Sequence, residues 1–300
     1  QPNQMRPHTV SVDNFYMMQC EVSNFDYLSY VNFVAEKDSV LAKTLLPDTL
    51  CWRRRGTWNE PYVDYYLRHP AYQQYPVVGV SYNQAVAFAE WMTEQYNSLP
   101  EEEKSFQKVR FRLPTEREWE YAARGGLQLS NFPWGGPYMR NAQGTRLANM
   151  LYISQASVYV DTVWVEEQVI PGDSTKPELK QTVRILSSGF GDYMGVAGSL
   201  NDAADVTAPV KSYWPNGYGL YNMTGNVEEM VDAWYYRDEN TESNSNATPM
   251  KTEDPSGVTR GGSWSDPGYY GIVSTRQYYE GKDSSSAERG FRLVMDVVEY

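Results

Sequence analysis

The periodic segments of this 300-residue chain are short, and long irregular stretches separate them. Apolar residues recur at helical spacing in three segments, at about 24–36, 82–96 and 116–124. Strand patterns occur at 9–19, 76–80 and 158–165, and two more flank a tight loop at 259–264 and 289–294. Residues 45–75 and 189–198 are typical of loops, and 237–257 of a mobile surface loop. The pattern favours a loop-rich α+β fold with two or three helices.

Each predicted helix begins at a residue that can cap it. Ser23 and Ser81 precede the first two helices, and Thr115 with Glu118 forms a capping box for the third. Gly125 follows the third helix, as expected of a residue that ends a helix in the left-handed conformation. These caps predict where the helices start and stop.

The charge balance limits the classes of partner. Against 26 Lys and Arg stand 38 Asp and Glu, so the net charge is −12, which argues against nucleic acid and against anionic lipid. No run of 18 apolar residues exists, so we expect membrane contact only through a lipid anchor upstream of Gln1. Aromatic residues reach 14%, which suits either an irregular core or a binding interface, and we favour the core.

The sequence offers few residues for catalysis. Two cysteines and two histidines cannot assemble a Cys/His zinc cluster. The sequence does not decide whether Cys20 and Cys51 form a disulfide. Glu228 and Glu229 are adjacent and would diverge rather than work as an acid/base pair. We therefore assign no catalytic residue.

Five sequence blocks carry a resemblance to a known family. They are Phe111–Gly126 (FRLPTEREWEYAARGG), Phe132–Gly135 (FPWG), Asn216–Asn226 (NGYGLYNMTGN), Arg260–Trp264 (RGGSW) and Gly290–Arg292 (GFR). In this order they resemble the formylglycine-generating-enzyme (sulfatase-modifying-factor) domain over about residues 9–295. The resemblance implies a loop-rich variant of the C-type-lectin fold with a small twisted antiparallel sheet. We expect a single domain, 1–300, with inserts at about 37–75, 152–201 and 237–257.

A narrower resemblance concerns the first insert. Residues 46–50, 59–72 and 75–80 resemble an insert of the gliding-motility lipoproteins GldJ and GldK (PorK) of the Bacteroidota. It implies a type IX secretion and gliding component at the periplasmic face of the outer membrane, bound to other protein subunits and able to form a homo-oligomer or ring. Candidate contacts in the insert are Trp52, Trp58, Tyr62, Tyr65, Tyr66 and Tyr72. Packing of these aromatics onto the core is the equal alternative.

The family's enzymes oxidise a substrate cysteine with a copper ion held by two cysteines. By resemblance, those cysteines would stand at Asp266 and near Gly271. Cu(I) prefers soft thiolate ligands, which neither residue supplies, so we expect no copper and no oxidase activity. A related iron site with three histidines is excluded, because the chain has two.

The resemblance also implies structural calcium. Asn222, Gly225, Val227 and Glu229 match one family site, with side-chain oxygens from the first and last and carbonyls from the others. Asn149, Met150, Asp202 and Ala204 match a second site less closely.

Three classes of function follow. The leading one is a non-catalytic scaffold that works through protein–protein assembly. The alternative is a ligand- or receptor-binding module of C-type-lectin type that displays residues 264–290, where Tyr269, Tyr270, Tyr278 and Tyr279 lie. The third is an enzyme with another chemistry, for which no residues can be named.

Overall fold

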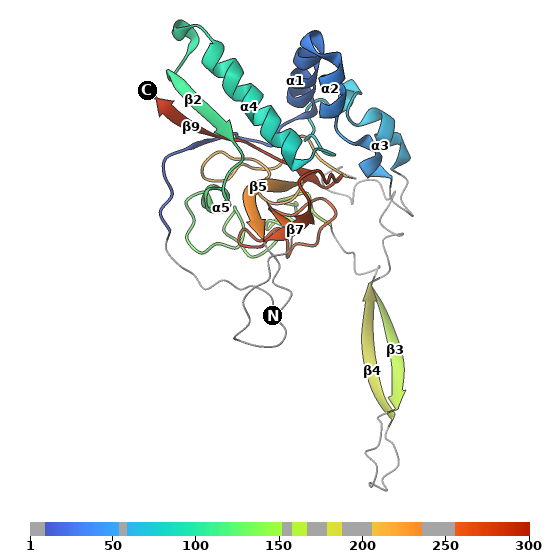
Figure 1. The fold of residues 1–300 in the computed structure, drawn as a ribbon. Helices are drawn as coiled ribbons and strands as arrows, with labels where there is room; N and C mark the ends of the chain where they lie inside the picture. Colours follow the sequence, from blue (N-terminus) through green and yellow to red (C-terminus); the bar gives the residue numbers. More distant parts are fainter. Residues whose placement is uncertain (1–9, 54–58, 152–157, 167–178, 188–205, 236–255) are drawn as a thin grey trace, which may run out of the picture.

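The computed structural model describes residues 10–53, 59–151, 158–166, 179–187, 206–235 and 256–300. Helices α1, α2 and α4 gather on one side of the body in Figure 1, with α3 beside them. Strands β2 and β9 run alongside α4, and β5 and β7 lie beneath. The α-helices are α1 (Asn24–Lys37), α2 (Ser39–Leu45), α3 (Glu60–Tyr65), α4 (Tyr82–Ser98) and α5 (Glu116–Arg124). Short 3-10 helices are η1 (Thr49–Trp52), η2 (Pro70–Tyr72) and η3 (Glu101–Glu103).

The described strands form three sheets. They are β1 (Tyr16–Met17), β2 (Lys108–Arg112), β3 (Val158–Glu166), β4 (Leu179–Ser187), β5 (Glu228–Tyr235), β6 (Ser256–Arg260), β7 (Gln277–Glu280), β8 (Arg289–Gly290) and β9 (Val294–Glu299). The first sheet has the antiparallel order β1-β9-β2, the second is the β3-β4 ribbon, and the third has the order β7-β6-β5-β8. Only its β5–β8 pair is parallel among the described strand pairs. The expected loop-rich α+β fold with small sheets is confirmed.

The predicted helix caps are all present. Ser23 and Thr115 each form a reciprocal capping box, with Asp26 and Glu118 respectively, and Ser81 pairs with Gln84 in the same way. Gly125 takes the left-handed conformation (φ 57°) that ends α5. These interactions are local, which explains why the sequence predicts them.

Several predicted boundaries are wrong. The strand expected over 9–19 is reduced to β1, because only Tyr16 and Met17 have strand partners, on β9. Residues 76–80 are buried but form no strand; Pro76 makes an isolated bridge to Ser23 instead. The loop predicted for 45–75 contains η1, α3 and η2, which are too short to show a helical period. Most of the predicted loop at 237–257, and all of 189–198, lie outside the described residues.

Two clusters of aromatic residues anchor the fold. Between α1 and α4, Tyr27 stacks on Phe88 with ring centroids 5.6 Å apart, and both contact Phe291. A second cluster joins the first insert to the body, where Trp52 stacks on Trp264 with ring centroids 6.2 Å apart. The described part of the first insert therefore packs as an integral part of the domain. No described helix is long and apolar enough to cross a membrane.

Candidate functional site

A buried ion pair joins β5 to the segment after β8. Glu229 accepts hydrogen bonds from Arg292 Nε (2.7 Å) and Nη2 (2.6 Å) and from Trp119 Nε1 (2.7 Å). Arg292 and Glu229 are 0% and 1% exposed. The Arg292 guanidinium therefore balances the charge of this carboxylate, and the Trp119 indole adds a neutral hydrogen bond.

Glu21 is a second buried carboxylate in the same centre, and the sequence analysis missed it. Its oxygens accept from Asn226 Nδ2 (2.9 Å) and Asn222 Nδ2 (3.1 Å). Burial raises the pKa of Glu21 to about 8; the Arg292 charge opposes the shift and the Glu229 charge adds to it. Asn222 and Asn226 have φ of 53° and 69°, a region that asparagine tolerates well. The one sequence signal for a buried Glu21 was its position two residues before Ser23, the N-cap of α1.

The predicted calcium set fits the structure in part. Asn222 Oδ1 is buried without a hydrogen-bond partner among the described residues, as a cation ligand would be in the absence of its ion. Gly225 has φ of 76°, and a side chain there would collide with the Asn149 carbonyl. Val227 is fully buried, and Glu229 turns to Arg292 rather than toward Asn222. Asn222 approaches Glu21 through its Nδ2 and not its Oδ1, and calcium at this centre stays a prediction.

Half of the second predicted calcium site belongs to the same centre. Asn149 donates from Nδ2 to the Val206 carbonyl (2.7 Å) and to Asn226 Oδ1 (3.3 Å), and its own carbonyl accepts from Asn226 N (2.8 Å). Met150 is 5% exposed. Asp202 and Ala204 lie outside the described residues. Across the described ranges, no three His, Cys, Asp or Glu side chains are grouped so as to hold a metal.

The two positions that match the copper cysteines are occupied in a different way. Asp266 Oδ2 accepts from Ser263 N (2.9 Å) and Ser263 Oγ (2.6 Å), so this carboxylate caps its own turn. A Cβ atom at Gly271 would lie 2.5 Å from Met150 Sδ and 2.7 Å from Thr224 Cγ2. The Gly271 carbonyl also accepts from Thr224 Oγ1 (2.9 Å). A side chain at position 271 would therefore require Met150 or Thr224 to shift.

The remaining titratable groups nearby serve structural roles. Glu228 accepts from Thr259 Oγ1 (2.7 Å) and pairs with Arg289 Nε (3.0 Å), and burial raises its pKa. Cys20 and Cys51 are not bonded to each other, and burial raises the pKa of the Cys20 thiol. Raised thiol pKa values disfavour nucleophilic use.

The insert aromatics proposed as partner contacts lie at different depths. Trp52 and Tyr66 are 1% and 2% exposed, and the Tyr66 hydroxyl donates to the Pro76 carbonyl (2.7 Å). Tyr62 and Tyr72 are half-buried against them. Tyr65 is 56% exposed and is the described member of the set most open to a partner. Trp58 lies outside the described residues.

Comparisons with known proteins bear on the family and the fold of the chain. The profile of the sulfatase-modifying factor enzyme 1-like domain matches residues 2–297. The formylglycine-generating enzyme of Mus musculus is 29% identical over 96% of this chain and 67% of its own length. The inactive C-alpha-formylglycine-generating enzyme 2 of Bos taurus is 26% identical over 74% of this chain and 50% of its own length. Among solved structures, PvdO from Pseudomonas aeruginosa superposes with a TM-score of 0.54 at 21% identity, covering 99% of this chain and 86% of that one, which supports the fold alone.

Proposed function

We propose, from the premise that this chain belongs to the sulfatase-modifying factor enzyme 1-like family, that it is a non-catalytic scaffold in a bacterial cell-envelope machine. The machine would be the type IX secretion and gliding-motility apparatus, at the periplasmic face of the outer membrane. The chain would bind other protein subunits there through its inserts, as a homo-oligomer or ring. A lipid anchor upstream of Gln1 would supply the membrane attachment.

The observation that carries the non-catalytic proposal is the packing at Gly271. Restoring a cysteine side chain there would require Met150 or Thr224 to move, because either contact is closer than real Cβ atoms tolerate. Asp266 supplies a hard carboxylate where Cu(I) requires soft sulfur. The existence of relatives called inactive is consistent with such a loss.

The scaffold role rests on the first insert and is tested by isolation of the native assembly. We would purify the protein from native membranes in mild detergent and identify the co-purifying proteins by mass spectrometry. Outer-membrane and secretion-apparatus proteins at a fixed ratio would support the scaffold. A solitary monomer in the aqueous fraction would contradict it.

The second candidate is a ligand- or receptor-binding module that displays residues 264–290. The exposure of Tyr269 (62%) and Tyr278 (43%) favours it, because exposed tyrosines are common in binding surfaces. Tyr279 does not contribute, since it is 4% exposed and packs in the core. Variation among close relatives that is confined to the exposed positions of this segment would favour the receptor role over the scaffold.

A further inference from the structure

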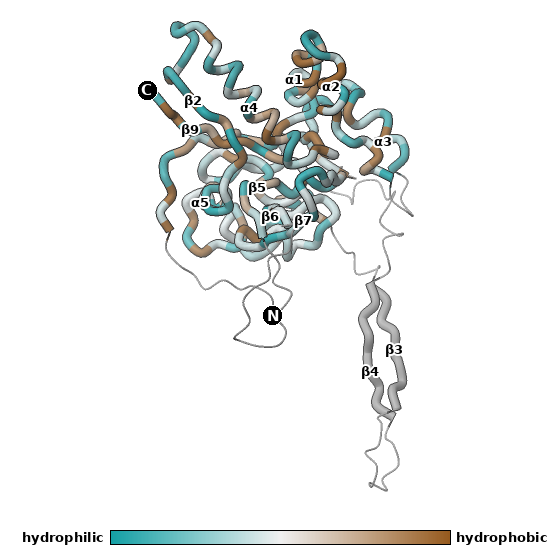
Figure 2. The backbone as a smooth tube through the Cα atoms, in the orientation of Figure 1, coloured by the Kyte–Doolittle hydropathy of each residue, from teal (hydrophilic) through white to brown (hydrophobic). Residues whose placement is uncertain are grey.

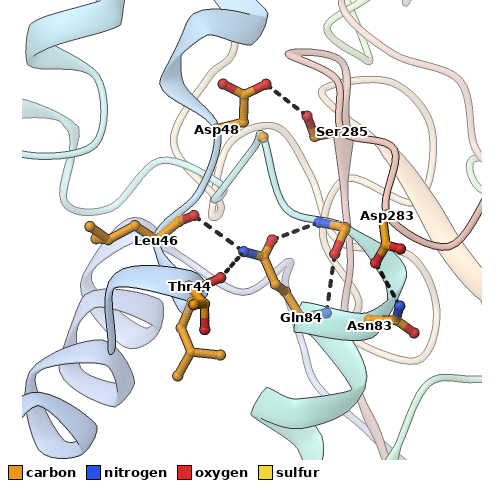
Figure 3. Close-up of a pocket in the computed structure, with 10 residues that line it drawn as sticks. Thr44, Leu46, Asp48, Asn83, Gln84, Asp283 and Ser285 are labelled. Carbon is orange, nitrogen blue, oxygen red and sulfur yellow. Dashed lines mark hydrogen bonds between the residues drawn. The ribbon is translucent and has the colours of Figure 1, made fainter. Parts of the chain in front are cut away.

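A polar groove lies where the first insert meets the body, away from the buried carboxylates described above. Its cavity volume is about 440 Å³. Figure 3 shows side chains from the end of α2, the start of α4 and the loop after β7 around it. The lining residues are Thr44, Leu45, Leu46, Asp48, Gly79, Ser81, Asn83, Gln84, Asp283 and Ser285.

Both charged residues of this lining are acidic. Asp48 Oδ2 accepts from Ser285 Oγ (3.1 Å), and its Oδ1 accepts from Leu50 N (2.9 Å). Asp283 Oδ1 accepts from Asn83 Nδ2 (2.7 Å). Neither carboxylate forms an ion pair with a Lys or Arg in the described part of the chain, and their hydrogen bonds come from neutral donors. Lys282, which precedes Asp283, lies over the rings of Tyr82 and Trp234. A cationic group is the complement of such a lining.

The groove is held in shape by the body. Gln84 donates from Nε2 to the carbonyls of Thr44 (2.9 Å) and Leu46 (3.2 Å), and its Oε1 accepts from Ser81 N (2.9 Å), as Figure 3 shows. Gly79 has φ of 75°, and a side chain there would collide with the Asp48 carbonyl. The insert therefore approaches the body closely at this point. A site that is already ordered loses little conformational entropy on binding.

Exposed aliphatic side chains border the acidic lining. Leu46 belongs to the lining and is 37% exposed, and Leu50, whose amide donates to Asp48, is 54% exposed. Leu41 is 50% exposed and lies one helical turn before Leu45 on α2. Figure 2 shows hydrophobic residues on α2, at the outer side of the molecule. Exposed apolar groups beside a polar groove are typical of surfaces that bind other proteins.

We propose that this groove binds a Lys or Arg side chain of a partner polypeptide, with apolar residues next to it in the partner sequence packing on Leu41, Leu46 and Leu50. The two carboxylates select the cation, and the leucines supply apolar contact area on either side. This proposal rests on the scaffold function, because the scaffold function supplies the partner. The groove adds the chemistry of the partner segment that would dock at the first insert.

The test uses the whole chain and a defined probe. The probe is the capped peptide acetyl-Leu-Arg-Leu-amide, and citrulline in place of its arginine removes the charge while keeping the shape. Binding is followed by NMR through the side-chain amides of Asn83 and Gln84, which line the groove. We expect these signals to shift with the arginine peptide, and the citrulline peptide to bind at least fivefold more weakly.

Matched variants assign the effect to the two carboxylates. Asp48→Asn with Asp283→Asn keeps the size of both side chains, and asparagine still caps η1. We expect this variant to bind the arginine peptide about tenfold more weakly. Added salt should also weaken binding of the arginine peptide to the wild type, because salt screens the attraction between the charges. Asp283→Lys, at an exposed position, should block binding by placing a cation in the groove. Glu102→Gln, which alters an exposed acid of η3, is the control and should bind as the wild type does.

Equal binding of the arginine and citrulline peptides, no binding by the wild type, or wild-type binding by the double variant would each overturn the proposal. The native co-purification separates this failure from that of the scaffold. If subunits co-purify with the chain but its groove does not bind the arginine peptide, the scaffold function is supported and the groove proposal is refuted. If the chain binds the arginine peptide but no subunit co-purifies with it, the groove proposal is supported and the scaffold function is refuted.

Discussion

Replacement of Glu21 by glutamine should change the way in which stability depends on pH. Burial raises the pKa of Glu21 to about 8 in the folded chain, against 4.5 for the exposed group. Between these two values the unfolded chain ionises Glu21 while the folded chain keeps it protonated. The unfolded state therefore binds fewer protons, and wild-type stability falls as pH rises through this window. A glutamine side chain cannot ionise, so the Glu21→Gln variant lacks this loss.

The size of the effect follows from the shift. One pKa unit corresponds to about 1.36 kcal/mol, so from pH 5 to pH 7.5 the variant should gain about 3 kcal/mol on the wild type. The free energy of unfolding is measured by urea denaturation at both pH values for the two proteins. The comparison is between slopes, so a constant cost of the substitution, such as a weaker bond to Asn222 or Asn226, cancels.

One cancellation and one control variant protect the interpretation of this experiment. Glu228, whose pKa is also raised by burial, contributes to the pH dependence of both proteins and cancels in the difference. Glu102→Gln removes an exposed acid and should follow the wild type at both pH values. Parallel pH profiles for wild type and Glu21→Gln would refute the idea that Glu21 is held protonated by burial at this centre.

Four other predictions concern the same domain. Asp266→Cys with Gly271→Cys should bind no Cu(I) in a competitive titration and should lower stability by about 1–3 kcal/mol, since the second side chain overpacks Met150; tight copper binding would contradict this. Arg292→Met should lower the urea-derived stability by about 3–5 kcal/mol, because its carboxylate partner stays buried without a charge partner. Calcium at about 1 mM should raise the Tm of wild type relative to EDTA, and Asn222→Ala should abolish the shift; equal Tm values would remove the calcium prediction. Tyr65→Ala should weaken subunit pull-down with an unchanged Tm if the exposed insert aromatic is a contact.

Local sequence signals explain which parts of the fold were predictable. The caps at Ser23, Ser81 and Thr115 act within one helical turn, so the helix starts could be predicted from neighbouring residues alone. Strand β1 and the buried segment 76–80 depend instead on partners far away in the sequence. Their pairing decides how much of each segment becomes a strand, and no local pattern contains that information.

The candidate site shows the same division. The family resemblance indicated Asn222 and Gly225, which take positive φ values that suit these residue types. Spacing did not indicate that Glu229 would pair with Arg292, because the two lie 63 positions apart and meet only in the folded core. Tyr66 is a similar case: an aromatic in an insert was interpreted as a contact candidate, whereas its hydroxyl donates to Pro76 inside the domain. Replacing Tyr66 would therefore report on stability rather than on partner contact.

The family blocks have an additional structural task in this chain. Trp264 of the Arg260–Trp264 block belongs to the aromatic cluster that receives Trp52 of the first insert, and so does Val227, which directly follows the Asn216–Asn226 block. Trp264 Nε1 also donates to the Ala287 carbonyl (3.2 Å), which holds its ring in place for this stacking. A segment that in the family's enzymes precedes the reactive cysteines thus supports an insert here. Substitution of Trp264 is therefore expected to disturb the packing of the first insert, because the Trp52 ring stacks on it.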